Sequence, residues 1–152
     1  MNRSNHQAFT LIEVLLVISL LAIISSLSVF AGNDSYQRAL AANDIERIVS
    51  VLYRARSLAQ GSVCSIQPCE EPKLQGVRIE QGEVWLFEGS QYEEDTVVET
   101  FLLSDGLTVT PMTVFFLPHT GAATANKTIK IRDAFGRERS IVVSEAGVIS
   151  VN

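Results

Sequence analysis

The chain is poor in the residues that build metal centres and catalytic sites. Its 152 residues include two cysteines and two histidines. No CxxC pair, His-rich tract or acidic loop of metal-binding spacing is present. His119 has no Ser, Cys or carboxylate arrangement around it that would predict a nucleophile or an acid–base pair. We therefore expect no metal, no cofactor and no enzymatic activity.

Basic charge is also scarce. The chain has 12 lysines and arginines against 17 acidic residues, for a formal net charge of −5. General affinity for nucleic acid needs a basic surface. The composition therefore argues against nucleic acid as a partner.

One long apolar run stands out against this background. Residues 9–31 number 23, about 35 Å of helix at 1.5 Å per residue, which is enough to cross a bilayer. A secretory signal peptide carries its small-residue cleavage site after a shorter apolar core, whereas Ala8 precedes this run. Arg3 also precedes it, which predicts a cytoplasmic N-terminus. We expect a single-pass protein of the cytoplasmic (inner) membrane whose C-terminal domain is periplasmic or extracellular.

Glu13 interrupts the start of this run. A carboxylate costs roughly 2.5–3.5 kcal/mol near the centre of a membrane helix and less near an end. One interpretation places Glu13 at the interface with its carboxylate in water. The other gives it a functional partner inside the membrane.

The residues around Glu13 resemble a known motif. Ala8–Glu13 reads AFTLIE and is similar to the type IV prepilin motif, in which a small residue, usually Gly, precedes FTLIE. The resemblance implies cleavage between Ala8 and Phe9 by a prepilin peptidase, followed by N-methylation of Phe9. It also implies that Glu13 pairs with the new amino group of a neighbouring subunit. The implied partners are other pilin or pseudopilin subunits, membrane lipid and an inner-membrane assembly platform.

A second helical segment follows residues 32–35. Apolar residues recur there at steps of three and four, which indicates one helix face that covers a sheet: Ala41, Ile45, Ile48, Val49, Leu52, Ala55 and Ala59. Gln60–Ser62 supplies a stop. Gly32 and Asn33 either bend a continuous helix or separate two helices, the second capped by Asp34 or Ser35.

The remainder alternates short β-rich runs with turn residues. The predicted strands are 63–66, 76–80, 84–87, 97–103, 107–109, 113–117, 127–132, 139–144 and 148–151, the last three forming an antiparallel meander. The expected fold is α+β and pilin-like, with a long N-terminal helix packed on an antiparallel sheet. Its parts are a cytoplasmic leader (1–8), a transmembrane and filament-assembly helix (9–31), an amphipathic half (32–62) and a β-rich domain (63–152).

A weaker resemblance extends into the β-rich part. Tyr53–Ala59, Phe116–Gly121 and Ile141–Ile149 are similar to segments of the H-type pseudopilins of type II secretion and of FimT-type minor pilins. That family usually has a basic residue after the final glycine, where this chain has Val148. The resemblance implies a minor pilin or pseudopilin, a structural subunit of a type IV pilus or of a type II secretion pseudopilus.

Cys64 and Cys69 enclose four residues. Outside the cytoplasm a disulfide is chemically permitted. Across so short a loop it would stabilise the fold by about 2 kcal/mol. The alternative is two unpaired thiols.

Gly136–Arg139 matches GRxR, a pattern associated with DNA binding in FimT-type minor pilins. With Lys130 and Arg132 nearby, the possible DNA contacts are Lys130, Arg132, Arg137 and Arg139. The alternative is a solvated hairpin tip. A rival from a different class is a single-span membrane protein whose β-domain binds a ligand, which predicts no cleavage after Ala8.

Overall fold

The structure is a computed structural model that describes residues 10–66 and 71–152, without the side chains of residues 27–34. The predicted leader, Phe9 and Cys69 lie outside the described residues. The chain divides into two compact units, Met1–Tyr36 and Gln37–Asn152, and each is described by itself. The fold is α+β: an N-terminal helix packs on antiparallel sheets, as the sequence predicts.

Helix α1 spans Leu11–Gln60 and belongs to both units. It continues through Gly32 and Asn33, so no second helix begins at Asp34 or Ser35. Among the described residues, no helix combines the length and the apolarity that a membrane crossing needs.

The C-terminus of α1 ends at the predicted stop. The N–H of Val63 donates to the carbonyl of Leu58 (3.0 Å), and that of Ser62 donates to the carbonyl of Ala59 (3.1 Å). These two bonds form a Schellman motif, which needs a left-handed residue just after the helix. Ser62 takes that conformation with φ 50°.

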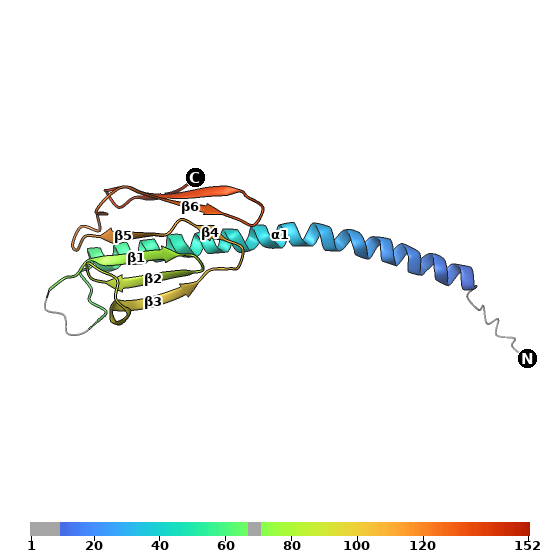
Figure 1. Cartoon of the computed structure of the whole chain (residues 1–152), viewed down its shortest axis with the longest axis horizontal. Coiled ribbons are helices and arrows are strands. Elements are labelled where there is room, and N and C mark those ends of the chain that lie inside the picture. The colour runs from blue at the N-terminus through green and yellow to red at the C-terminus, as the bar shows by residue number, and fades with distance from the viewer. Residues whose placement is uncertain (1–9, 67–70) are drawn as a thin grey trace, which may run out of the picture. The chain divides into compact units, whose positions relative to one another are not determined.

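The second unit contains two antiparallel four-stranded sheets (Figure 1). The first has the order β3-β2-β1-β5, and the second has the order β4-β6-β7-β8. The strand bounds are β1 Gln75–Glu80, β2 Glu83–Glu88, β3 Val97–Leu102, β4 Thr108–Val109, β5 Met112–Phe116, β6 Lys127–Arg132, β7 Glu138–Val143 and β8 Ile149–Val151. A short 3₁₀ helix, η1 (Glu94–Thr96), precedes β3.

The predicted C-terminal meander is confirmed. Ile129 lies opposite Ile141, and Val143 lies opposite Ile149. Ile131, however, lies opposite Arg139. The pair of apolar residues Ile129 and Ile141 is therefore followed, on the same face, by a pair of an isoleucine and an arginine.

The predicted strand at 63–66 is wrong, for a reason that lies in β2. The carboxylate of Glu88 accepts the backbone N–H groups of Ser65 and Ile66, the latter at 3.2 Å. Glu88 is 2% exposed and also accepts a hydrogen bond from Gln75 Nε2 at 3.2 Å. Because a side chain satisfies these N–H donors, the segment forms no ladder with a neighbouring strand.

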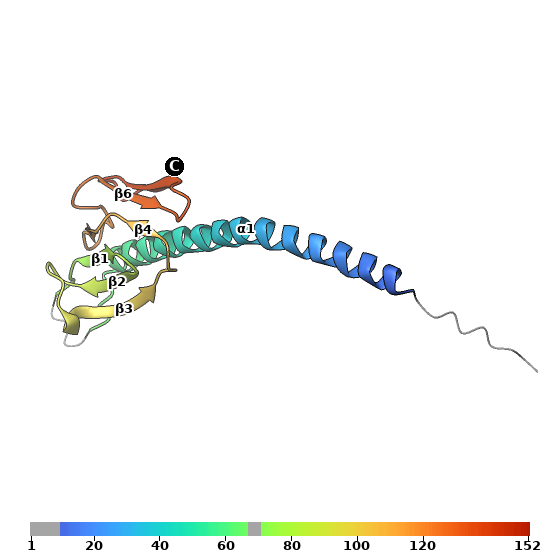
Figure 2. The same cartoon turned by 45° about the vertical axis from the view of Figure 1, so that its right-hand side comes forward.

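The core of this unit lies between α1 and both sheets. Figures 1 and 2 show the Gln37–Gln60 part of α1 running alongside the strands. The predicted apolar helix face is confirmed, with its central residues buried and Ala41 and Val49 partly buried. Its buried members, joined by Val51, are Ile45, Ile48, Leu52, Ala55 and Ala59.

Asp44 of α1 is also buried, at 3% exposure, although it is acidic. Its carboxylate accepts the N–H of Ser104 at 3.0 Å. Nearby, Arg47 Nη1 donates to the carbonyl of Leu102 at 2.9 Å. These two bonds attach the end of β3 to α1.

Candidate functional site

Glu13 lies in the first turn of α1. Its N–H donates to the carbonyl of Thr10 (3.1 Å) and to Thr10 Oγ1 (3.4 Å). Thr10 is therefore the N-cap and Glu13 the third helical residue, the spacing of a capping box. Sequence reasoning missed this cap, although the spacing Thr-x-x-Glu could have revealed it. An acidic side chain here also interacts favourably with the positive end of the helix dipole.

The helix that follows Glu13 is apolar on every side. Its large apolar side chains lie on all faces and are all exposed: Val14, the first of them, is 47% exposed, and Ile24, the last, is 59% exposed. The few hydroxyls between them bond within the helix: Ser19 donates to the carbonyl of Leu16 at 2.8 Å, and Ser25 to that of Leu21 at 2.7 Å. A helix that is apolar all round needs surroundings that cover it.

This N-terminal segment matches a known family. Residues 3–29 match the model of the prokaryotic N-terminal methylation motif, which is type IV prepilin-like. The chain is type IV pilin-like. The motif implies prepilin processing and assembly with other pilin subunits. Neither the comparison with curated proteins nor that with solved structures found a match.

The processing site of this pilin-like chain stays a prediction. Ala8 and Phe9 lie within the matched range but outside the described residues. Glu13 lies within the matched range and is one of the described residues. It is the third residue of α1, at the N-terminal end of the helix.

Cys64 lies in the segment that Glu88 holds, just after α1. It is disulfide-bonded, and the described residues include no free cysteine. The other cysteine of the sequence, Cys69, lies outside the described residues. The predicted pairing therefore stays a prediction.

The four predicted DNA contacts do not form one patch. Strand residues alternate between the faces of a sheet. Lys130 and Arg132 lie on the face of β6 away from α1 and line one surface pocket with Glu138. Arg137 and Arg139 line a different pocket, against α1.

Two of these arginines are also held by carboxylates. Arg132 Nε bonds Glu138 Oε1 at 3.1 Å, and this hydrogen bond and the charge of Arg132, with a smaller effect from Lys130, lower the pKa of Glu138. Arg137 Nε bonds Asp133 Oδ2 at 2.6 Å. Burial alone would raise the pKa of Asp133, but the hydrogen bonds from Arg137 and from the Phe135 N–H outweigh it, and the net pKa lies below 3.8.

The three segments of the weaker resemblance meet at the end of α1. Gly121 and Gly147 both have positive φ, 63° and 77°, and both approach the side chain of Arg56. The N–H of Ala123 donates to the carbonyl of Glu145 at 3.0 Å and joins the two loops. The contacts are close packing around one arginine, with no arrangement of reactive groups.

Sequence reasoning also missed a polar pair at this end. Ser62 Oγ and His119 Nδ1 are 2.7 Å apart. Both residues have positive φ, and the N–H of His119 donates to the carbonyl of Ala59 at 2.9 Å. Among the described residues no carboxylate orients His119, as a catalytic histidine would need. We therefore interpret the pair as a structural contact that joins the end of α1 to the 117–121 loop.

Proposed function

We propose that this chain is a minor pilin or pseudopilin, a structural subunit of a type IV pilus or of a type II secretion pseudopilus, without catalysis of its own. The observation that carries the proposal is the methylation motif at residues 3–29. The α+β arrangement, with the second part of α1 packed on two sheets, is consistent with it. The weaker resemblance of the β-rich segments supports a minor rather than a major subunit.

The same proposal places the protein in the cytoplasmic membrane before assembly. The all-round apolar surface from Leu11 to Ile24 would be covered by lipid, and within a filament by equivalent helices of other subunits. The domain after the helix would be exported to the periplasm or the cell exterior. A prepilin peptidase and an inner-membrane assembly platform are the partners that this route requires.

Glu13 would act during assembly. Once residues 1–8 are removed, the new amino group at Phe9 is a cation at the end of the helix where the Glu13 carboxylate lies. A carboxylate in an apolar bundle is tolerated when a cation meets it, and removing one partner of such a pair costs roughly 3–5 kcal/mol. The pair can therefore set the register of a subunit as it joins.

Intact-mass measurement of the full chain, extracted from membranes of cells with an active prepilin peptidase, tests the proposal. The expected mass lacks residues 1–8 and carries one added methyl group. A full-length mass would instead support the rival, a single-span protein whose β-domain binds a ligand. The matched control is the same chain from cells without the peptidase, which should keep its full length.

DNA binding, as in FimT-type minor pilins, is the second candidate, supported by GRxR at Gly136–Arg139. The separation of Lys130 and Arg132 from Arg137 and Arg139 on two faces of the sheet weighs against it, because a duplex needs a continuous basic surface. A mobility-shift assay at several salt concentrations decides between the two functions, with the wild type and a variant in which Arg137 and Arg139 are both replaced by Ala. A salt-dependent shift that the variant loses would favour DNA binding.

A further inference from the structure

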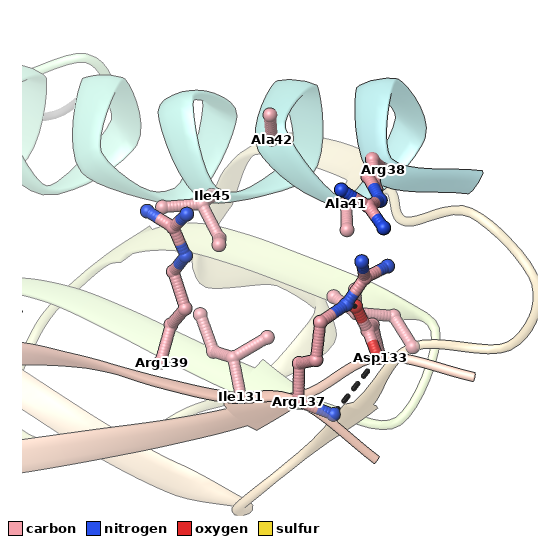
Figure 3. A pocket seen from close by; sticks show the side chains of 9 residues that line it. Arg38, Ala41, Ala42, Ile45, Ile131, Asp133, Arg137 and Arg139 are labelled. Atoms are coloured by element: carbon pink, nitrogen blue, oxygen red, sulfur yellow. Dashed lines mark hydrogen bonds and ion pairs between the residues drawn. The ribbon is translucent and has the colours of Figure 1, made fainter. Parts of the chain in front are cut away.

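Three arginines line a hollow between α1 and the β6–β7 hairpin. Figure 3 shows Arg38 on the helix and Arg137 and Arg139 on the hairpin, with their guanidinium groups directed into the space between. The cavity measures about 400 Å³. A second cavity of about 400 Å³ shares Ala42, Ile45 and Arg139 with it and continues along α1 to Ser50 and Val151. We call the two together the arginine groove.

The strand geometry places Arg139 on the face that packs against the helix. Along β7, Val143 and Ile141 are fully buried beneath α1. The alternation of side chains puts Arg139 on the same face, and Ile131 lies opposite it. Arg139 therefore places a positive charge on the face of the sheet that otherwise packs apolar side chains against α1.

The helix contributes a matching feature. Arg38 precedes Ala41 and Ile45 at helical spacing, so it lies at the end of the stripe that packs on the sheets. Alanine at 41 and at 42 is too small to fill the space beside it. The groove is therefore open at the point where the core stripe of α1 ends.

The residues that line the first cavity carry more positive than negative charge. Its lining contains three arginines and one aspartate, a net charge of +2. Asp133 is engaged by Arg137 at 2.6 Å. No ion pair in the described part of the chain involves Arg139. A cleft of one sign with apolar walls attracts the opposite charge, and a guanidinium suits a carboxylate in particular.

The chain itself presents a segment of matching charge. Glu93, Glu94 and Asp95 are the only three consecutive acidic residues in the sequence, and all three are exposed. They lie in the connection between β2 and β3, where Glu93 is the N-cap of η1 and Glu94 and Asp95 are its first two residues. Among the described residues none of the three forms an ion pair.

The two charged features lie at opposite ends of the strands. Figures 1 and 2 both show the β2–β3 connection at one end and the β6–β7 turn at the other. Complementary surfaces at opposite ends of one unit join copies head to tail, and such a contact propagates instead of closing. A head-to-tail contact between two copies is the arrangement that this geometry favours.

We propose that the arginine groove binds the acidic segment Glu93–Asp95 of a second copy of this chain. The inference rests on the proposed subunit role and adds a contact between β-domains to the contacts of the N-terminal helices. Arg139 is the residue that holds a carboxylate of the neighbour.

Zero-length cross-linking of the full chain tests this contact. The variant Arg139→Lys puts an amine in the groove. A carbodiimide activates a carboxylate of the acidic segment, the amine displaces the activating group as its urea, and an amide forms with net loss of water. Mass spectrometry of a mixture of ¹⁵N-labelled and unlabelled chains identifies links between different copies.

The expected product joins position 139 of one copy to Glu93, Glu94 or Asp95 of another. Replacing these three with the corresponding amides should abolish it. Lys130 is the control within the same chain, because it presents an amine on the opposite face of the hairpin. Equal linking from both positions, or no link from position 139 in assembled chains, would overturn the proposal.

Charge reversal provides a second measurement. Arg139→Glu and Glu94→Arg should each weaken self-association of the full chain in detergent about tenfold, as loss of a close charge pair predicts. A mixture of the two variants, or the double variant, should recover most of the affinity. Lys130→Glu changes the net charge by the same amount outside the groove and should have no effect.

The outcomes separate this inference from the proposed function. A chain that keeps residues 1–8 contradicts the subunit role itself. A processed chain that assembles normally with Arg139→Glu contradicts only the groove contact. Salt-dependent binding of duplex DNA that Arg139→Glu abolishes would assign the groove to phosphate instead of to the acidic segment.

Discussion

Glu13 has a local and an intermolecular interpretation, and the structure adds weight to the local one. Its N–H is capped by Thr10, and its carboxylate lies at the favourable end of the helix dipole. The subunit proposal uses the same position differently, because the free amino group created by processing appears at that end of the helix. The two interpretations predict different effects of substitution.

Glu13→Ala should leave membrane insertion intact and strongly impair assembly into filaments, because the amino group of a neighbour loses its partner. Thr10→Ala is the control: it removes the cap, which is worth about 1 kcal/mol, and keeps the charge. Filament yield in sheared fractions and membrane content by fractionation measure the two effects. Normal filaments with Glu13→Ala would contradict the pairing role.

Position 147 requires glycine for two reasons, its backbone conformation and its close surroundings. A Cβ there would overlap the carbonyl oxygen of Gly121 and lie 3.1 Å from Arg56 Nε. Gly136 has nearly the same φ, 78° against 77°, and nothing within 4 Å of its Cβ position. Gly136→Ala should lower the free energy of unfolding by about 1–2 kcal/mol, the cost of a left-handed alanine.

Gly147→Ala should lower it by roughly 2 kcal/mol more than Gly136→Ala, because the backbone of the 117–121 loop must also shift. Denaturant unfolding of the full chain in detergent, followed by near-ultraviolet circular dichroism, measures both variants. Equal losses would mean that the loops around Arg56 adapt without strain.

At the scale of elements, the turn between β6 and β7 depends on one ionised carboxylate. Asp133 Oδ1 accepts the N–H groups of Phe135 (2.9 Å) and Arg137 (3.0 Å), and Oδ2 accepts the Arg137 guanidinium. These bonds hold the pKa of Asp133 below 3.8, against the opposing effect of burial. The ionised Asp133 carboxylate therefore stabilises the folded state, and this contribution is fully present above the pKa that Asp133 has in the unfolded chain.

That stability should be lost as the pH falls below 3.8 and through the lower pKa of the folded state. Amide hydrogen exchange at Phe135 and Arg137, compared with other amides of β6 and β7, measures the loosening. Asp133→Asn keeps the shape without the charge and should make exchange at these amides independent of pH in this range, after correction for intrinsic rates. Persistent protection in the wild type at still lower pH would contradict the role of the carboxylate.

Glu88 plays the corresponding part for the segment after α1. It accepts the N–H groups of Ser65 and Ile66 and the amide of Gln75 while almost fully buried. Glu88→Ala should destabilise the fold by about 1–3 kcal/mol, because these donors lose their acceptor. Exchange at Ser65 and Ile66 should rise most.

Glu83→Ala, at the other end of β2, is the matched control for Glu88→Ala, since no side-chain hydrogen bond of Glu83 occurs among the described residues. Faster exchange at Ser65 and Ile66 in both variants would mean that β2 as a whole, and not the Glu88 carboxylate, orders the segment that carries Cys64.

At the scale of the whole molecule, the proposed route to the filament begins with processing. Ala8→Glu replaces a methyl group beside the predicted cleavage point with a larger, charged side chain. The substitution should therefore block removal of residues 1–8 in cells with an active prepilin peptidase. Ala8→Gly is the matched control and should be processed at least as well as the wild type. Immunoblotting after gel electrophoresis measures the cleaved fraction, and efficient cleavage of Ala8→Glu would refute this site.

Much of the fold followed from local patterns. The apolar stripe of residues 41–59 and the strands from β1 to β8 matched their predicted places, because helix and strand periodicity and turn residues are properties of short segments. The exception at 63–66 has the composition of a strand. The acceptor for its N–H groups, Glu88, lies more than twenty residues away, where no local pattern can reveal it.

The sequence by itself determined the class of this protein, because the prepilin-like motif and its apolar run are contiguous and need no tertiary contact to be read. Only the tertiary structure decided which polar residues lie together. The turn between β6 and β7 sets the register that separates Lys130 and Arg132 from Arg137 and Arg139. The packing of α1 on that sheet then makes a groove of Arg38 and Arg139, which are a hundred residues apart and meet only when the helix and the hairpin pack together.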